Sequence, residues 1–365
     1  MKTTKTDPQR KQFRTIIGVD LGDKKHHVCV TDKDGNILCE KTVANNKEQL
    51  AALAREHKGA LFAIEVGSHS PWISRLIESN GCSCLVANAR KLRAIYQNER
   101  KCDEHDARML AKLARVDPEL LSPIQHCSEA QQLHRLNLTL RDSLVRRRAD
   151  MITTIRFSLK SLGIRIPACS TAYFAPRCRE ELEGTTVLET VEAFLQALDS
   201  LNSQIKVLDK QIARIATEHY PQTKLLEQIA GVGPITSLSF VLTIGEPGRF
   251  EDPRDVGAYI GLVPRRDQSG QSDKQLPISK TGNGEMRRLL VQCAQYILGR
   301  FGPDCDLRRH GLNLAAKGGK SAKRKAVVAV ARKLAVLMLM LWKTGEPYDP
   351  LRNAPIKDPE EKEAA

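Results

Sequence analysis

The sequence predicts an α/β domain at the N-terminus followed by a largely helical chain. Strand-like runs alternate with a helical pattern up to about residue 122, and long helical patterns dominate residues 123–222. A third stretch, 223–348, combines glycine turns with amphipathic helices, and 349–365 has the composition of a frayed tail. At 365 residues the chain is long enough for two or three domains with separate cores.

The first domain, 12–122, is expected to open with a three-stranded meander. RTIIGVDLGDKKHHVCVTDKDGNILCEKTV contains an apolar run with Asp20, an alternating strand around residues 28–31, an Asp34–Gly35 turn and a further strand. GALFAIEVG predicts a fourth strand that ends in Glu65, followed by a helix in SPWISRLIESNG and a short strand in CSCLVANA. DEHDARMLAKLARV has apolar residues at helical spacing, which places Asp103 near the first turn of a helix.

The middle region, 123–222, predicts two long helices. In the second, apolar residues recur with four–three spacing, which indicates a heptad seam of about four repeats. An intramolecular helical hairpin and a coiled coil between two chains would bury the same seam, so both remain open at this point. The seam residues are Val187, Val191, Phe194, Leu198, Leu201, Ile205, Leu208, Ile212 and Ile215.

The third region begins with LLEQIAGVGPITSLSFVLTIG, which predicts two apolar helices joined by a turn at Gly231 and Gly233. This pattern resembles a helix-hairpin-helix, whose backbone N–H groups bind phosphate, although glycine turns also join ordinary helices. RRDQSGQSDK, residues 265–274, has the composition of a solvated loop, and ISKTGNGEMRRLL predicts a glycine turn that leads into an amphipathic helix.

The charge balance favours nucleic acid as the partner. There are 57 Lys and Arg against 43 Asp and Glu, and the net charge of +14 suits a polyanion. Residues 303–345 contain ten Lys or Arg and two Asp, so more than half of the net charge is concentrated there. No apolar run is long enough to span a bilayer, no secretion signal is recognisable, and ten cysteines without C-x-x-C pairs indicate reduced thiols in the cytoplasm.

Four acids stand out by their predicted positions. Asp20 lies in the first strand, Glu65 ends another strand, and Asp103 and Asp106 share one face at the start of a helix. Hard carboxylate oxygens in such a cluster bind Mg²⁺ or Mn²⁺ for phosphodiester chemistry. An acid at a helix start is otherwise commonly a cap. An ATP site is not supported, because GGKS at 318–321 lacks the glycine that a Walker A loop requires at Leu314.

With these acids and the CDEHDARML stretch, the chain resembles the DEDD transposases of bacterial insertion sequences, the IS110 and IS1111 group. The C-terminal half carries the resemblance further, in IAGVGPITSLSFVLTIG and in RFEDPRDVGAYIGLVPRRDQSGQSDKQLPISKTGNGEMRRLL. The resemblance covers nearly the whole chain and implies a RuvC-like, ribonuclease-H-fold domain at 12–122 and a helical coiled-coil arm at 123–222. It further implies a mainly helical transposase domain at 223–348 with a helix-hairpin-helix-like element, and a tail at 349–365.

The same resemblance implies the chemistry. Asp20, Glu65, Asp103 and Asp106 match the family's metal-binding acids, and Ser269, rather than Ser272, matches its nucleophile. It also implies a covalent phosphoserine intermediate, donor and target DNA, a guide RNA encoded by the element, and a homo-oligomer. The expected nucleic-acid contacts are Gly231, Gly233, Arg265, Arg266, Lys274, Lys280, Arg287, Arg288, Lys320, Lys323, Arg324 and Lys325.

Two other functions fit the same residues. A metal-only RuvC-like nuclease or Holliday-junction resolvase would use the four acids and leave Ser269 in a structural loop. A non-catalytic nucleic-acid-binding protein would need only the glycine turn and the basic C-terminal region.

Overall fold

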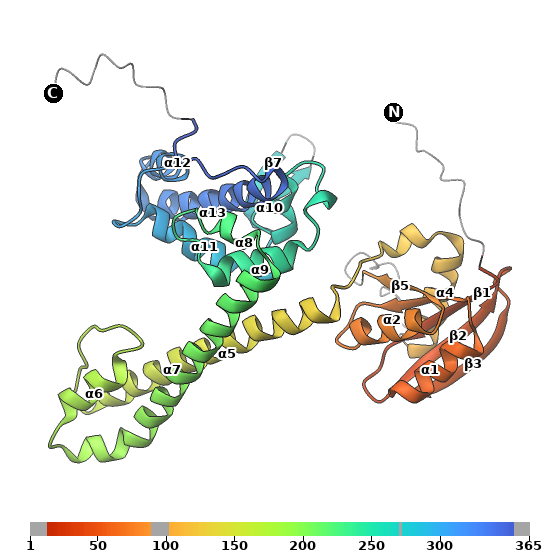
Figure 1. Ribbon diagram of the computed structural model, residues 1–365, viewed down its shortest axis with the longest axis horizontal. Helices are drawn as coiled ribbons and strands as arrows, with labels where there is room; N and C mark the ends of the chain where they lie inside the picture. The colour runs from red at the N-terminus through yellow and green to blue at the C-terminus, as the bar shows by residue number, and fades with distance from the viewer. Residues whose placement is uncertain (1–12, 89–101, 270–271, 354–365) are drawn as a thin grey trace. The chain divides into compact units, whose positions relative to one another are not determined.

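The computed structural model describes residues 13–88, 102–269 and 272–353 (Figure 1). The chain divides into two compact units between Ser128 and Glu129. The helical arm and the region after it fall within the second unit, and the boundary expected at residue 222 stays a prediction.

The first unit is built on a mixed five-stranded sheet with the order β3-β2-β1-β4-β5. β1 is antiparallel to β2, and β2 to β3, whereas β1, β4 and β5 run parallel. This arrangement confirms the predicted meander and the two later strands, and it is consistent with a RuvC-like fold. The elements are β1 (Thr15–Asp20), β2 (Lys25–Asp32), β3 (Ile37–Ala44), α1 (Lys47–Glu56), β4 (Leu61–Glu65), α2 (Ser70–Ser79), β5 (Ser83–Ala87), α4 (Asp103–Val116) and the short helix η1 (Pro118–Leu121).

Both faces of this sheet are covered by helices. Ile17 and Ile64 point to one face and pack with Ile73 of α2. Ile16 and Ala63 point to the opposite face and pack under α4. Apolar runs that are buried on both sides are typical of parallel strands between helices, which explains why β1 and β4 lack polar alternation.

The second unit begins with two long helices, α5 (Glu129–Ser161) and α7 (Thr186–His219), which pack against each other within one chain (Figure 1). Arg141 binds Asp209 at 2.8 Å and Arg148 donates to Asn202 at 2.9 Å, so the helices run antiparallel. The intramolecular hairpin is therefore confirmed, and a coiled coil between chains stays a prediction.

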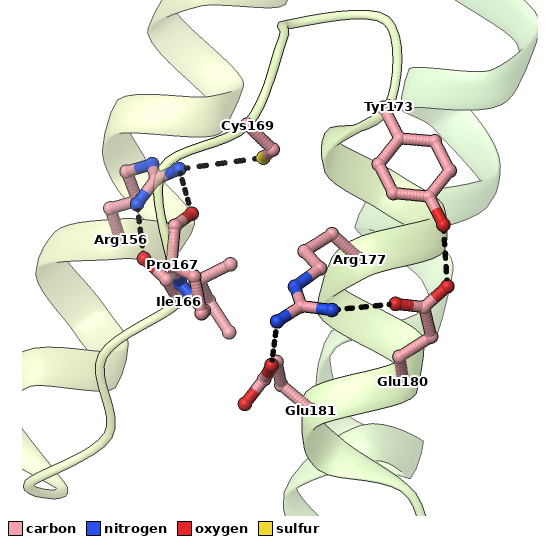
Figure 2. Close-up of polar contacts among 8 residues, drawn as sticks. All are labelled: Arg156, Ile166, Pro167, Cys169, Tyr173, Arg177, Glu180 and Glu181. Atoms are coloured by element: carbon pink, nitrogen blue, oxygen red, sulfur yellow. Dashed lines mark hydrogen bonds and ion pairs between the residues drawn. The ribbon is translucent and has the colours of Figure 1, made fainter.

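The tip of this arm is closed by α6 (Phe174–Leu182) and by arginine contacts (Figure 2). Arg156 of α5 donates to the carbonyl of Ile166 at 2.7 Å and to that of Pro167 at 3.1 Å, which ties the connecting segment to the helix. Glu180 of α6 accepts a hydrogen bond at 2.6 Å from Tyr173, the residue that precedes the helix.

The rest of the second unit packs around α13, whose Val330, Leu334 and Met338 are fully buried. The first helix predicted before Gly231 is only the single turn α8, so the helix-hairpin-helix likeness is confined to the turn and α9. None of the described helices is both long and apolar enough to cross a membrane. The elements are α8 (Thr223–Leu226), α9 (Pro234–Ile244), η2 (Pro247–Arg249), α10 (Asp255–Ile260), β6 (Pro264–Ser269), β7 (Ser272–Ile278), α11 (Gly284–Leu298), α12 (Asp306–Ala315) and α13 (Gly319–Thr344).

Candidate active site and nucleic-acid interface

The sheet of the first unit brings two of the four acids to one edge. Asp20 is the last residue of β1 and Glu65 is the last residue of β4, and these parallel strands are neighbours with Val19 opposite Ile64. Side chains alternate along a strand, so Asp20 lies on the same face as Gly18 two residues earlier. That face is the one that α4 covers.

A close approach between β1 and α4 brings the other two acids to this edge. A Cβ on Gly18 would lie 1.9 Å from the carbonyl oxygen of Ala107 and 2.6 Å from the amide nitrogen of Ala111. Only glycine therefore allows α4 to pack this closely on the strand. Asp103 begins α4, and Asp106, which is 7 % exposed, comes one turn later.

The other three carboxylates act electrostatically on Asp20. The pKa of Asp20 is raised from 3.8 to about 6, first by burial and then by the negative charges of Asp103, Asp106 and Glu65. His27 lies opposite Asp20 on β2, and its Nε2 is 3.7 Å from an oxygen of Asp103. Its charge lowers the pKa of Asp20. An unneutralised cluster of this kind attracts a cation.

The donor set suits a hard divalent ion, since four carboxylates supply only oxygen ligands. Within the described residues, no three His, Cys, Asp or Glu side chains converge closely enough to hold one ion. The other acids are therefore close enough to act on Asp20 by charge, but the side chains are not arranged as the ligands of one ion.

Two contacts that the sequence did not predict hold the elements around the acids. Arg108 of α4 forms a two-pronged ion pair with Glu40 of β3, which ties the helix across the sheet. The Nε2 of His69, in the loop after β4, lies 3.5 Å from Asp23 in the loop after β1. These partners are far apart in sequence, and no local pattern indicates them.

Ser269 lies in the second unit, at the end of a β-hairpin. Its stretch was expected to be a loop, and that expectation is wrong: β6 and β7 pair antiparallel, with Ser269 opposite Ser272. Polar residues occupy both faces of β6, so backbone hydrogen bonds rather than an apolar pattern define these strands. Residues 270–271, between the two serines, lie outside the described residues.

Two family models match this chain. One, described as a transposase and named for the DEDD acids of IS110, matches residues 17–164, and the other, described as transposase IS116/IS110/IS902 family, matches residues 223–309. The chain belongs to the IS110 family of insertion-sequence transposases. It is accordingly an enzyme that cleaves DNA and transfers its strands.

Two relatives match this transposase over most of its length, and a third matches less than half of it. The transposase for insertion sequence element IS1111A of Coxiella burnetii is 27 % identical over 342 residues, which cover 91 % of each chain. The transposase for IS1328 of Yersinia enterocolitica is 28 % identical and covers 79 % of this chain and 85 % of its own. A pilin gene-inverting protein of Moraxella bovis is 28 % identical over 152 residues, 40 % of this chain and 46 % of its own.

The predicted nucleic-acid contacts of the transposase differ in their surroundings. Arg265, Arg266, Lys280, Lys320, Lys323, Arg324 and Lys325 are all exposed. Arg287 donates to the carbonyls of Ile260 and Thr281, and Arg288 binds Asp142 of α5, so both guanidinium groups have partners within the chain. The side chain of Lys274 lies outside the described residues.

The glycine turns near the hairpin are tightly built. A Cβ on Gly261 would lie 2.3 Å from the carbonyl oxygen of Thr281, and one on Gly282 would lie 2.1 Å from that of Tyr259. Between them Lys280 has a φ of 55°, a left-handed conformation that is uncommon for lysine. Its backbone N–H donates to Gly261, so packing around the turn holds the exposed lysine in place.

A cavity of about 1090 Å³ lies between the hairpin and α13. Pro264 and Leu276 of the hairpin and Met340 of α13 supply part of its apolar lining. Two of the predicted contacts, Arg324 and Lys325, line it, as do four cations that the predicted set omits: Arg254, Arg332, Lys333 and Arg352. The sequence signals concentrated basic charge in this region, but only the fold shows which residues surround the cavity.

Proposed function

We propose that this transposase exchanges DNA strands with a divalent-metal site at Asp20, Glu65, Asp103 and Asp106 and with Ser269 as its nucleophile. The observation that carries the proposal is where the four acids lie: Asp20 and Glu65 end neighbouring parallel strands, and α4, which packs on β1, begins with the other two. Burial first, and then the negative charges of the other three acids, raise the pKa of Asp20. A bound cation would relieve the repulsion between these negative charges, so the cluster is suited to bind one. The DEDD family model supports the same assignment, because its match over residues 17–164 includes all four acids.

The proposed reaction is a transesterification. The Oγ of Ser269 forms a bond to a backbone phosphorus, and the bond from that phosphorus to a deoxyribose oxygen breaks. The serine loses its proton and the departing oxygen gains one, which leaves a phosphoserine and a free hydroxyl. A hydroxyl of the second DNA strand then loses its proton and forms a bond to the same phosphorus, while the bond from phosphorus to the Oγ of Ser269 breaks and Oγ regains a proton. A bound Mg²⁺ or Mn²⁺ would supply positive charge for the phosphate oxygens.

Positive charge on the second unit supports the handling of the substrate. Arg265 and Arg266 precede Ser269 on β6 and are exposed, which suits contact with a phosphate backbone. We further propose that an element-encoded RNA guides the choice of donor and target DNA, and that the enzyme acts as a homo-oligomer. Both extensions rest on the family resemblance and on the basic surface.

The decisive comparison is Ser269→Ala against Ser272→Ala. The two serines face each other in the hairpin register, so the second substitution is a matched control. With labelled donor DNA, Ser269→Ala should abolish covalent attachment and strand exchange, whereas Ser272→Ala should retain both. Continued cleavage by Ser269→Ala would overturn the proposal in favour of a metal-only nuclease.

A second experiment tests the acids and the oligomer together. Asp20→Asn should lose cleavage and keep DNA binding, because the substitution removes charge from the metal site alone. Mixing Asp20→Asn with Ser269→Ala chains should restore exchange if acids and serine from different protomers act on one phosphate. Cleavage by Asp20→Asn alone at the wild-type rate would contradict the metal site.

The guide RNA is tested by what purifies with the enzyme. Sequencing of co-purified nucleic acid should return a single structured RNA from the element, and nuclease digestion of that RNA should stop exchange. Unchanged exchange after complete digestion would exclude RNA guidance.

A further inference from the structure

The C-terminal end of α11 presents an aromatic surface that the proposed chemistry does not use. Tyr296, on the last turn of the helix, is 47 % exposed, and Phe301, three residues beyond the helix, is 70 % exposed. The guanidinium carbon of Arg300 lies 4.4 Å from the centre of the Phe301 ring. We call Tyr296, Arg300 and Phe301 the α11 platform.

The platform stands on a rigid turn. Gly302 donates its backbone N–H to the carbonyl of Gly299 at 3.2 Å, so Arg300 and Phe301 occupy the two central positions of a β-turn. Arg308 donates to the carbonyls of Ile297 and Gly299 at 2.5 and 2.6 Å and fixes the end of the helix. Phe301 is therefore held outward by a defined backbone.

Gly302 makes this turn possible. A Cβ at that position would lie 2.1 Å from the carbonyl oxygen of Ile297 and 2.7 Å from Nη1 of Arg308. Because both atoms belong to the hydrogen bonds that fix the turn, any larger residue would displace them. The turn that carries the exposed Phe301 ring is therefore closely packed against the end of α11 and Arg308.

The platform adjoins the glycine turn that precedes α9. A Cβ on Gly231 would lie 2.8 Å from Cδ1 of Tyr296, so the turn rests on that ring, whereas one on Gly233 would meet nothing within 4 Å. Gly231 has a φ of 86°, and Gly233 is the N-cap of the eleven-residue helix α9. Tyr296 therefore connects the C-terminal end of α11 to the glycine turn that precedes α9.

We propose that the α11 platform stacks an unpaired DNA base, with Phe301 against the base and Arg300 beside its phosphate. An aromatic face binds any base, and a neighbouring arginine adds attraction to the strand. A transposase that exchanges strands generates unpaired DNA, so the proposal rests on the strand-transfer activity and not on the identity of the nucleophile.

The test uses the full-length enzyme and fluorescence anisotropy with a single-stranded DNA oligonucleotide, the matching duplex and an RNA of the same sequence. Phe301→Ala should weaken binding of the single-stranded DNA by about 5- to 100-fold and change duplex binding by less than about twofold. Phe301→Trp should restore the affinity because it keeps an aromatic face. Photocrosslinking of a 5-bromodeoxyuridine oligonucleotide should label Phe301 or Tyr296.

Phe157 provides the matched control. It is 65 % exposed on α5, and Nζ of Lys160 lies 4.7 Å from its ring centre, so it reproduces an exposed phenylalanine beside a cation at another place. Phe157→Ala should leave the affinity for single-stranded DNA unchanged.

Three outcomes would overturn the platform. An equal loss of affinity for single-stranded DNA in Phe301→Ala and Phe157→Ala would show that any exposed phenylalanine contributes in the same way. Wild-type affinity in Phe301→Leu would show that aromaticity is not needed, and a loss confined to the RNA would show that the base comes from RNA. Ser269→Ala should bind single-stranded DNA like the wild type, so failure of the proposed nucleophile is distinguishable from failure of the platform.

Discussion

The two regions that carry the proposed chemistry are built in different ways. The acids of the first unit depend on a buried core, because Asp20 and Glu65 end apolar strands and α4 packs on β1 through Gly18. Ser269 depends on a two-stranded hairpin whose β6 residues 265–268 are all exposed. Packing therefore fixes the acids, whereas the strand that carries the serine is held mainly by backbone pairing with β7, whose Ile278 contacts the core. Substitutions should separate these two kinds of support.

The largest expected effect concerns the packed region. Gly18→Val should destabilise the first unit by more than about 3 kcal/mol, because the new side chain meets the backbone of α4, which cannot move aside as a flexible side chain does. Urea denaturation followed by circular dichroism would measure the loss. Hydrogen exchange should show loss of protection in β1 and α4, with the second unit unchanged.

Gly67→Ala is the control for this substitution. Gly67 lies in the loop just after Glu65, and a Cβ there would meet nothing within 4 Å. The free energy of unfolding should change by less than about 0.5 kcal/mol. An equally large loss in this variant would mean that glycine flexibility, and not the contact between β1 and α4, supports the acids.

The comparison also explains what the sequence could predict. Apolar runs identified β1 and β4, and the helical spacing after Asp103 identified α4, so the positions of all four acids followed from local patterns. Helix α1 was not predicted, since it buries only Leu50, Leu53 and Ala54. The sequence predicts a loop where the hairpin lies, because pairing between polar strands leaves no periodic signal.

Side-chain partners were the least predictable part. Arg287 and Arg288 follow a glycine turn, as nucleic-acid contacts often do, yet both bind groups within the chain. Arg108 finds Glu40 in a strand 68 positions away. Sequence spacing reports which residues share a helix face, whereas the element opposite that face is decided by the tertiary fold.

The electrostatic cost of the acid cluster gives a prediction of intermediate size. The Asp20 carboxyl has a pKa of about 6 in the folded chain against an ordinary value of 3.8, so its ionised form opposes folding. Stability should fall as pH rises from about 4 to about 6, and Asp20→Asn should escape this loss. Without metal at pH 7, Asp20→Asn should be more stable than the wild type by about 1 kcal/mol, a value kept small because the Asp20 side chain is partly exposed and its charge is screened by solvent.

Divalent ions should reverse this difference. Added Mg²⁺ or Mn²⁺ should raise the melting temperature of the wild type at pH 7 and leave that of Asp20→Asn nearly unchanged, since ligand binding to the folded state stabilises it. Thermal scans at pH 4 and pH 7, with and without ion, measure both effects. A stability gain in Asp20→Asn that is equal at the two pH values would show that packing, and not charge, is responsible.

The smallest expected effect concerns the hairpin. Asp267 lies opposite Lys274 in the register of β6 and β7, and it is exposed. Asp267→Ala removes one exposed charge from a cross-strand position, where such pairs contribute a few tenths of a kcal/mol, so unfolding should shift by less than about 0.5 kcal/mol. Calorimetry of the full chain measures the shift, and a loss above about 1 kcal/mol would show that the hairpin has a packed support after all. If the free energy of unfolding is unchanged, any change in covalent attachment by Asp267→Ala reflects the local surroundings of Ser269 and not the stability of the fold. At the packed acid site, a substitution such as Gly18→Val would change stability and activity together.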